Sequence, residues 1–379
     1  MTLSVYQHWD PLKVCVVGRS YPPEFYSWIT VPRVRELFEK IAIETEEDYQ
    51  GIIKKLKSFG VDVLRPNLPA YKDILIQGQY MPPPMTPRDY MAMIGDTFYK
   101  GYQHNFEKFY KSVADPLWPE CKTFEEFNSL PNYIQDECIN VHNLDKFQKF
   151  YSSYDEIFDF IKKTNRIVYK PEISQSPGAY ITRIGRDLYF GTETYSQDQD
   201  SYKHIINKEF TQTRNHIVNT GGHSDGTYCP VCPGLIISLN DVPTYQDTFP
   251  DWEVVYLPGQ SWKSVEPFLK LKQKNAGKWW IPGFEQDQDV INVVESWLGH
   301  WTGYVEETVF DVNMLIIDPK NVMVFNYNKQ VFDALNRYNI TPHIVPFRHR
   351  YFWDGGIHCV TSDLHREGTM QDYFPGRNK

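Results

Sequence analysis

The sequence predicts an α/β fold in which five similar units close into a ring. Short apolar stretches recur along the chain, and turns rich in Gly, Asn, Asp and Pro separate most of them in pairs, as in β-hairpins. In most of these units a helical segment and a further strand follow, so that each unit reads strand, strand, helix, strand. Closure of such a radial repeat removes exposed sheet edges.

The first unit starts near the N-terminus and contains the longest predicted helix. A strand at 13–17 leads into a tight turn at Gly18–Ser20. Apolar residues at helical spacing predict a helix over 32–59, and Gly60 is a typical residue at a helix C-terminus. A last strand is expected at 61–64.

The other four units follow the same order. Hairpins are expected at 90–99, 180–190 and 314–325, and in the fourth unit a strand at 235–239 is expected to turn at Asn240–Asp241. Helices near 201–210 and 329–338, and closing strands at 166–169, 216–218, 252–256 and 341–346, complete these units.

Length and composition favour one globular domain. The chain has 379 residues, 41% of them hydrophobic and 16% aromatic, and no Gly/Ser linker divides it. We therefore expect a single domain over 1–379. The segment at about 260–308 is too long for an ordinary connection, so it is interpreted as an insertion, a lid or a partner surface.

The charge and hydropathy of the sequence limit the kinds of partner that the protein is expected to bind. The net charge is −9 and no long basic run occurs, which argues against nucleic acid or an anionic membrane and suits a cationic small molecule. No apolar run reaches membrane-spanning length, and the first residues lack the features of a signal peptide, so a cytoplasmic protein is expected. The sequence leaves a homodimer open.

The six cysteines are sparse for this length and suggest free thiols in a reducing compartment. Cys229-Pro-Val-Cys232 has the spacing of a zinc or redox pair, but a structural zinc site needs four ligands and no second pair is present. We interpret these two as ordinary loop cysteines and expect no metal.

One cysteine stands in a different setting, Gly355-Gly356-Ile357-His358-Cys359. A glycine pair allows backbone conformations closed to other residues, so the turn can present Cys359 as a nucleophile. The competing interpretation is a buried structural thiol. His358 is a further candidate for the site.

Other polar residues stand at the same position in their units, just before the hairpin. Asp89 precedes the second hairpin, His223 and Asp225 precede the fourth unit, and Cys359 precedes the first unit if the ring closes. In a radial repeat, equivalent positions face one axial cavity. Two carboxylates there can bind a planar guanidinium cation, which Cys359 can attack while His223 transfers protons.

At these residues the sequence resembles the amidinotransferases of the guanidine-modifying superfamily, over nearly the whole chain. The similar segments are Trp9–Gly18, Pro87–Asp89, Gly185–Asp187, His223–Asp225 and Gly356–Thr369. The resemblance implies a five-module, pseudo-symmetric α/β-propeller of ββαβ units with the site on its axis. It also implies transfer of the amidino group of arginine to an amine.

Carried over residue by residue, the resemblance makes Cys359 the nucleophile and His223 the general acid and base. Asp89 and Asp225 become ligands of the guanidinium group, and no metal or organic cofactor is implied. The substrates implied are small molecules, arginine and an amine acceptor.

The sequence departs from the family pattern in two places. The carboxylate expected before the third hairpin is replaced by Ser176–Ala179, with Glu172 or Gln175 as substitutes. An arginine that binds the acceptor's carboxylate is missing near Asp241–Pro243. Two alternatives therefore stay open: a guanidine hydrolase of the deiminase or dihydrolase type, and a guanidine binder with impaired catalysis.

Overall fold

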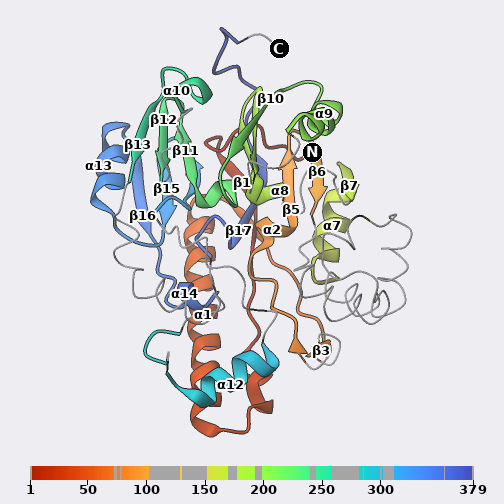
Figure 1. Ribbon diagram of the computed structural model, residues 1–379, viewed down its shortest axis with the longest axis vertical. Helices are drawn as coiled ribbons and strands as arrows, with labels where there is room; N and C mark the ends of the chain where they lie inside the picture. Colours follow the sequence, from red (N-terminus) through yellow and green to blue (C-terminus); the bar gives the residue numbers. More distant parts are fainter. Residues whose placement is uncertain are drawn as a thin grey trace.

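Five three-stranded sheets form the body of the fold (Figure 1). The computed structural model describes residues 2–71, 75–76, 79–101, 129, 152–169, 177–192, 199–239, 245–257, 281–284, 286–298, 301, 311–353 and 355–377. In each of the five sheets an antiparallel pair of strands is followed by a third strand parallel to the middle one. This is the predicted ββαβ order.

Four of the sheets are each built from one continuous stretch of the repeat. Their strands are β5 (Met91–Ile94), β6 (Thr97–Lys100) and β7 (Arg166–Tyr169); β8 (Ile181–Ile184), β9 (Asp187–Thr192) and β10 (Arg214–Asn219); β11 (Tyr228–Cys232), β12 (Leu235–Ser238) and β13 (Glu253–Tyr256); and β14 (Leu315–Asp318), β15 (Asn321–Val324) and β16 (Thr341–Ile344). Strands of the hairpins are buried almost throughout, as expected for sheets packed against their neighbours.

The fifth sheet closes the ring by joining the two ends of the chain. Strand β17 (Thr361–Arg366) pairs antiparallel with β1 (Leu12–Val17), which pairs in parallel with β2 (Asp62–Leu64). The C-terminal strand therefore supplies the first strand of the N-terminal unit. The closed radial α/β arrangement expected from the sequence is confirmed.

Helices cross from the second to the third strand of the sheets. The longest is α1 (Pro32–Ser58), with Pro32 at its first position, where the missing N–H costs nothing. The others are α7 (Asp155–Lys162), α9 (Gln199–Glu209), α10 (Tyr245–Thr248) and α13 (Lys329–Arg337). Asn328 caps α13 by accepting hydrogen bonds from the N–H groups of Gln330 and Val331.

Helix α12 (Gln288–Trp297) lies beside the N-terminal end of α1 (Figure 1). Arg33 of α1 forms ion pairs with Asp287 and Asp289, and Asp287 also caps α12. Helix α12 belongs to the predicted insertion at 260–308, of which only 281–284, 286–298 and 301 are described. Short elements near it are η1 (Pro23–Trp28), β3 (Leu75–Ile76) and β4 (Gln79–Tyr80); η4 (Ser152–Tyr154) and α14 (Arg350–Trp353) lie elsewhere.

Two local predictions are wrong. The residues Gly18–Ser20 do not form a hairpin turn, because the partner strand of β1 is β17. In the fourth unit, 235–239 contains the second strand of the hairpin, not the first. The first strand is β11, which was not predicted because it contains Pro230. Proline is tolerated there because β11 pairs on one side only. Cys229 and Cys232 therefore lie in a strand.

Among the described residues, no helix is long and apolar enough to cross a membrane. The C-terminal segment after β17 contacts the third unit of the ring. Asp187, fully buried, accepts from the guanidinium groups of Arg214 and Arg377. Trp9 donates to the hydroxyl of Tyr373 at 2.9 Å. Through Tyr373 and Arg377 the C-terminal segment thus contacts parts of the chain that are distant in sequence.

Candidate active site

Short helical or turn segments stand before four of the five hairpins and before β17. They are α2 (Pro87–Tyr90) before β5, α8 (Pro177–Tyr180) before β8, η5 (Ser224–Gly226) before β11, the turn at 311–312 before β14, and the turn at 357–360 before β17. Helix α8 packs against both α2 and η5, and α2 packs against β17. The equivalent positions of the repeat therefore meet, as the sequence pattern predicts.

Cys359 is buried in the turn that leads into β17. The two glycines before it are not required for the predicted reason, because neither has a positive φ. At Gly356 a Cβ atom would lie 2.3 Å from the side-chain oxygen of Asn313. A glycine is required there because the turn passes directly against Asn313.

The sulfur of Cys359 has two polar neighbours from other units. Its Sγ lies 3.6 Å from Oδ2 of Asp225, and the side-chain amide of Asn313 donates to it at 3.1 Å. Cys359 is therefore buried as a structural thiol would be, but its surroundings are polar. The amide donor favours a thiolate at this position, whereas the carboxylate opposes it.

Asp225 links the cysteine to the preceding residue of the turn. His358 Nδ1 lies 2.8 Å from the same oxygen, Asp225 Oδ2. Burial and the positive charge of Arg88 lower the pKa of His358 well below its usual value, so the imidazole is neutral. Because a carboxylate only accepts hydrogen bonds, Nδ1 carries the proton. This bond fixes the orientation of the Asp225 side chain.

His223 and Asp89 form a second pair at the site. His223 Nδ1 lies 3.7 Å from Asp89 Oδ1, and both side chains are largely buried. The ring of Tyr180, at the end of α8, meets the His223 ring edge to face at 4.7 Å between centroids. Ser224 Oγ donates to the backbone oxygen of Tyr180 at 2.9 Å, which anchors the segment that carries His223 and Asp225.

The third unit contributes no carboxylate from its described residues at this position, as the sequence indicates. Helix α8 brings Gly178 and Ala179 to the place where the family pattern has an aspartate. A Cβ atom at Gly178 would lie 2.4 Å from the backbone oxygens of Arg88 and Met91, so close packing excludes a side chain. Of the predicted substitutes, Glu172 and Gln175 lie outside the described residues, as does Asp241–Pro243.

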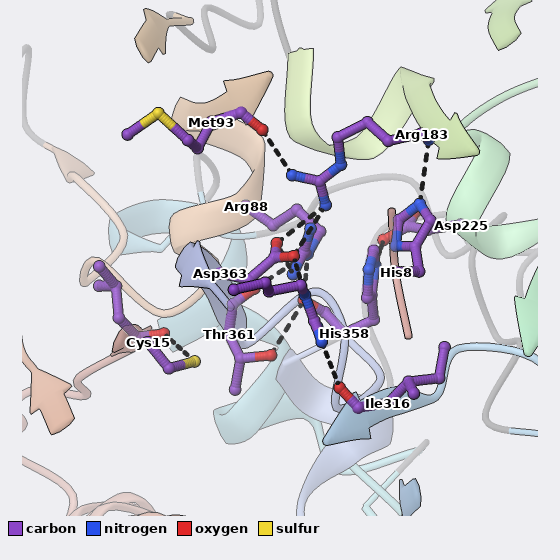
Figure 2. Close-up of polar contacts among 12 residues, drawn as sticks. His8, Cys15, Arg88, Met93, Arg183, Asp225, Ile316, His358, Thr361 and Asp363 are labelled. Carbon is purple, nitrogen blue, oxygen red and sulfur yellow. Dashed lines mark hydrogen bonds and ion pairs between the residues drawn. The ribbon is translucent and has the colours of Figure 1, made fainter. Parts of the chain in front are cut away.

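Three buried guanidinium groups surround one carboxylate. Figure 2 shows two of them, those of Arg88 and Arg183, pointing toward Asp363. Asp363 of β17 pairs with Arg88 at 3.1 Å, Arg183 at 2.9 Å and Arg366 at 2.7 Å. Although burial acts to raise it, the pKa of Asp363 is held well below its usual value by Arg183, Arg366 and Arg88. Arg88 Nε also donates to the backbone oxygens of His358 and Thr361, which ties the turn at Cys359 to α2.

A small cavity of about 20 Å³ adjoins the site, with room for roughly one water molecule. Its lining includes His8, Thr182, Asp225, Cys229, Asn313 and His358. His8 Nε2 accepts from the backbone N–H of Arg183 at 3.2 Å. Burial, followed by the charge of Arg183, lowers the pKa of His8 well below its usual value. Both imidazoles next to this cavity are therefore neutral.

The other described cysteines are free thiols with no partner cysteine among the described residues. Burial raises the pKa of Cys15 and Cys229 to about 12 and that of Cys232 to about 11. Within the described parts of the chain, no three His, Cys, Asp or Glu side chains gather as metal ligands would.

The structure shows where the residues singled out from the sequence lie relative to one another. Cys359, His358, Asp225, His223 and Asp89 come together in two contacting groups. Asn313 was missed, although its position directly before the fifth hairpin carries the same signal as Asp89 before the second. Asparagine before a strand reads as an ordinary turn residue, which hid it.

Relatives in sequence are amidinotransferases. The chain is 24% identical over 427 residues to the mitochondrial glycine amidinotransferase of Xenopus laevis, covering 97% of this chain and 84% of the relative. It is 21% identical over 399 residues to inosamine-phosphate amidinotransferase 1 of Streptomyces glaucescens, covering 98% and 99%. No family model matches the chain.

Solved structures show the same fold. SxtG, an amidinotransferase of Microseira wollei, has a TM-score of 0.60 and 16% identity and covers 99% of this chain and 100% of its own. The inosamine-phosphate amidinotransferase StrB1 of Streptomyces griseus has a TM-score of 0.60 and 17% identity, covering 98% and 99%. The repeat and its ring closure agree with this shared fold, and the sequence is similar to amidinotransferases over nearly the whole chain.

Proposed function

We propose that this protein transfers the amidino group of arginine to a primary amine through a covalent amidino-cysteine intermediate. The observation that carries the proposal is the contact between Cys359 Sγ and Asp225 Oδ2 at 3.6 Å. It places a candidate nucleophile next to a carboxylate, and the same short segment carries His223. Similarity to amidinotransferases over 97% of the chain supports this reaction class.

Asp225 and Asp89 are proposed to bind the guanidinium group of arginine. A carboxylate and a guanidinium pair through two parallel hydrogen bonds, which sets both charge and orientation. His358 holds Asp225 in place through the 2.8 Å bond to Oδ2. A guanidinium held against Asp225 has its central carbon close to Cys359 Sγ, which is the geometry that attack requires.

The reaction then proceeds in two half-reactions. The thiolate of Cys359 forms a bond to the guanidinium carbon, the bond from that carbon to the side-chain nitrogen of arginine breaks, and His223 gives a proton to the leaving amine. Ornithine departs and the amidino group stays on sulfur. An incoming amine loses a proton to His223, attacks the same carbon, and releases the thiolate.

Asp89 has a second proposed role beside His223. Its Oδ1 lies 3.7 Å from His223 Nδ1, close enough for its charge to stabilise the protonated imidazole. Helix α8 brings no described carboxylate to this position, whereas Asp89 lies beside His223. Asp89 would then serve both the substrate cation and the acid–base residue.

The proposed substrates are small molecules, and no cofactor enters the scheme. Free cysteines fit a reducing compartment, for which we propose the cytoplasm. We also propose that residues 1–379 form one domain with 260–308 inserted, and we leave a homodimer as the alternative to a monomer.

The experiment that tests the proposal incubates the protein with arginine labelled at the guanidino carbon, with and without a panel of primary amines. Ornithine and a labelled guanidino product that form only when an amine is present support transfer. Citrulline or labelled urea in the absence of amines would replace the proposal with the hydrolase alternative. Binding of arginine without any product would indicate a guanidine binder with impaired catalysis.

A further inference from the structure

The side chain of Asn313 makes four hydrogen bonds around the candidate nucleophile. Its Oδ1 accepts from the backbone N–H of His358 at 2.8 Å and from that of Cys359 at 3.1 Å. Its Nδ2 donates to Cys359 Sγ at 3.1 Å and to the backbone oxygen of Asp225 at 3.1 Å. The side chain is almost completely buried.

These partners fix which way round the amide lies. Two backbone N–H groups can only donate, so the atom facing them must be the carbonyl oxygen. The nitrogen must then face the sulfur and the backbone oxygen of Asp225, and both of its hydrogens have acceptors. Gly356 packs directly against this side chain, since a Cβ atom there would lie 2.3 Å from its oxygen.

Hydrogen bonds to a charged form favour that form, whereas a neighbouring like charge opposes it. Asp225 lies 3.6 Å from Cys359 Sγ and opposes the thiolate. The side-chain amide of Asn313 is in direct contact with the sulfur and donates a hydrogen bond to it. The amide therefore offsets part of the effect of Asp225.

We propose that Asn313 is a further catalytic residue, which donates to the sulfur of Cys359 as a thiolate and holds the turn that carries it. The inference rests on the proposed function, in which the thiolate attacks the guanidinium carbon and leaves it again. In both half-reactions negative charge builds up or is released at Sγ. A donor already aimed at that atom stabilises the charge without reorganisation.

Asn313→Asp separates this role from support of the turn. An aspartate has the same shape and accepts the same bonds from the N–H groups of His358 and Cys359, but it has no donor for the sulfur and adds negative charge. Asn336→Asp, the same change at an exposed position of α13 in the same unit, is the matched control.

The measurement is the rate of alkylation of Cys359 by iodoacetamide against pH, followed by peptide mass spectrometry in the absence of substrate. We expect the midpoint of the Asn313→Asp profile to rise by about one pH unit or more. The Asn336→Asp profile should match that of the unchanged protein. An Asn313→Asp profile that also matches it would overturn the proposal.

A second variant and a kinetic measurement complete the test. If Asn313→Asp does not fold, Asn313→Ser, whose hydroxyl is too short to reach the sulfur, should show the same upward shift, and an unchanged midpoint there overturns the proposal. In folded variants kcat should fall roughly 10- to 100-fold while KM for arginine changes little. Because alkylation needs no turnover, its result stands even if the amidino-transfer proposal fails.

Discussion

Cys359 Sγ lies 3.6 Å from Asp225 Oδ2, although 134 residues separate the two in the sequence. The closing strand of the ring brings one residue to the axis and the fourth unit brings the other. A carboxylate so near a thiol opposes its ionisation until a cation arrives. In the proposed reaction, binding of the guanidinium group would therefore favour formation of the thiolate.

Replacing Asp225 by Asn should reveal this electrostatic effect directly. The amide can still accept from His358 Nδ1, but the negative charge beside the sulfur is gone. We expect the pH midpoint of Cys359 alkylation to fall, opposite in sign to the shift for Asn313→Asp. A midpoint that rises or stays the same would show that Asp225 does not control the ionisation of the thiol.

The same variant should lose activity. Removing one partner of a buried, hydrogen-bonded charge pair costs about 2–5 kcal/mol, so kcat/KM for arginine should fall by that equivalent. Asp333→Asn is the matched control, since Asp333 is exposed on α13 and pairs with Lys329. Steady-state kinetics on both variants decide the point; equal kcat/KM values would remove Asp225 from the substrate site.

Stability should fall in mild acid because of two buried imidazoles. The pKa values of His8 and His358 are lowered by burial, so below about pH 6.5 the unfolded chain binds protons that the folded chain does not. Each histidine then removes up to about 1.4 kcal/mol of unfolding free energy per pH unit. Above about pH 7 this contribution is constant.

His8→Gln is the variant that checks this pH dependence. A glutamine oxygen can replace His8 Nε2 as the acceptor for the N–H of Arg183, and it does not titrate. Urea unfolding between pH 5 and 8 should show a shallower slope for the variant than for the unchanged protein. Identical slopes would mean that His8 is protonated in the folded state.

The Asp363 cluster should be a main source of stability at the axis. Asp363→Asn leaves Arg88, Arg183 and Arg366 without their shared counter-charge in a buried setting. Loss of one partner from such a buried network typically costs about 3–5 kcal/mol. Asp289→Asn, which weakens an exposed ion pair with Arg33, should cost below about 1 kcal/mol. Urea unfolding that gives the two variants equal losses would contradict this account.

Much of the fold could be predicted because the repeat is visible in the sequence. Turn residues at Gly95-Asp96 and Gly185-Arg186 mark hairpins that the structure has at the expected place. The fourth hairpin was misplaced because Pro230 and two cysteines in β11 do not read as a strand. Strand propensity is local, whereas the pairing that tolerates a proline depends on an edge position formed only by the sheet.

The candidate site was predictable where residue type alone suggests chemistry, as for Cys359, His223 and the two aspartates. Asn313 escaped notice because its role depends on contacts with Gly356 and Cys359, which lie more than 40 residues away. The ion pair between Arg88 and Asp363 could not be predicted for the same reason. Arg and Asp are usually surface residues, and only the folded structure shows that these two are buried and paired. The spacing of residues in the sequence shows which positions are equivalent in the repeated units, but it does not show these contacts.

The most direct test of the central claim is a mass measurement on Cys359 after brief incubation with arginine alone. The expected result is a peptide containing Cys359 that is heavier by one amidino group, whose mass returns to normal when an amine acceptor is added. Cys359→Ser should give neither the adduct nor the product. Cys232→Ser is the control: burial raises the pKa of the Cys232 thiol to about 11, so its loss should leave the behaviour of the protein unchanged. Transfer of the amidino group to an amine without any adduct on Cys359 would contradict the account.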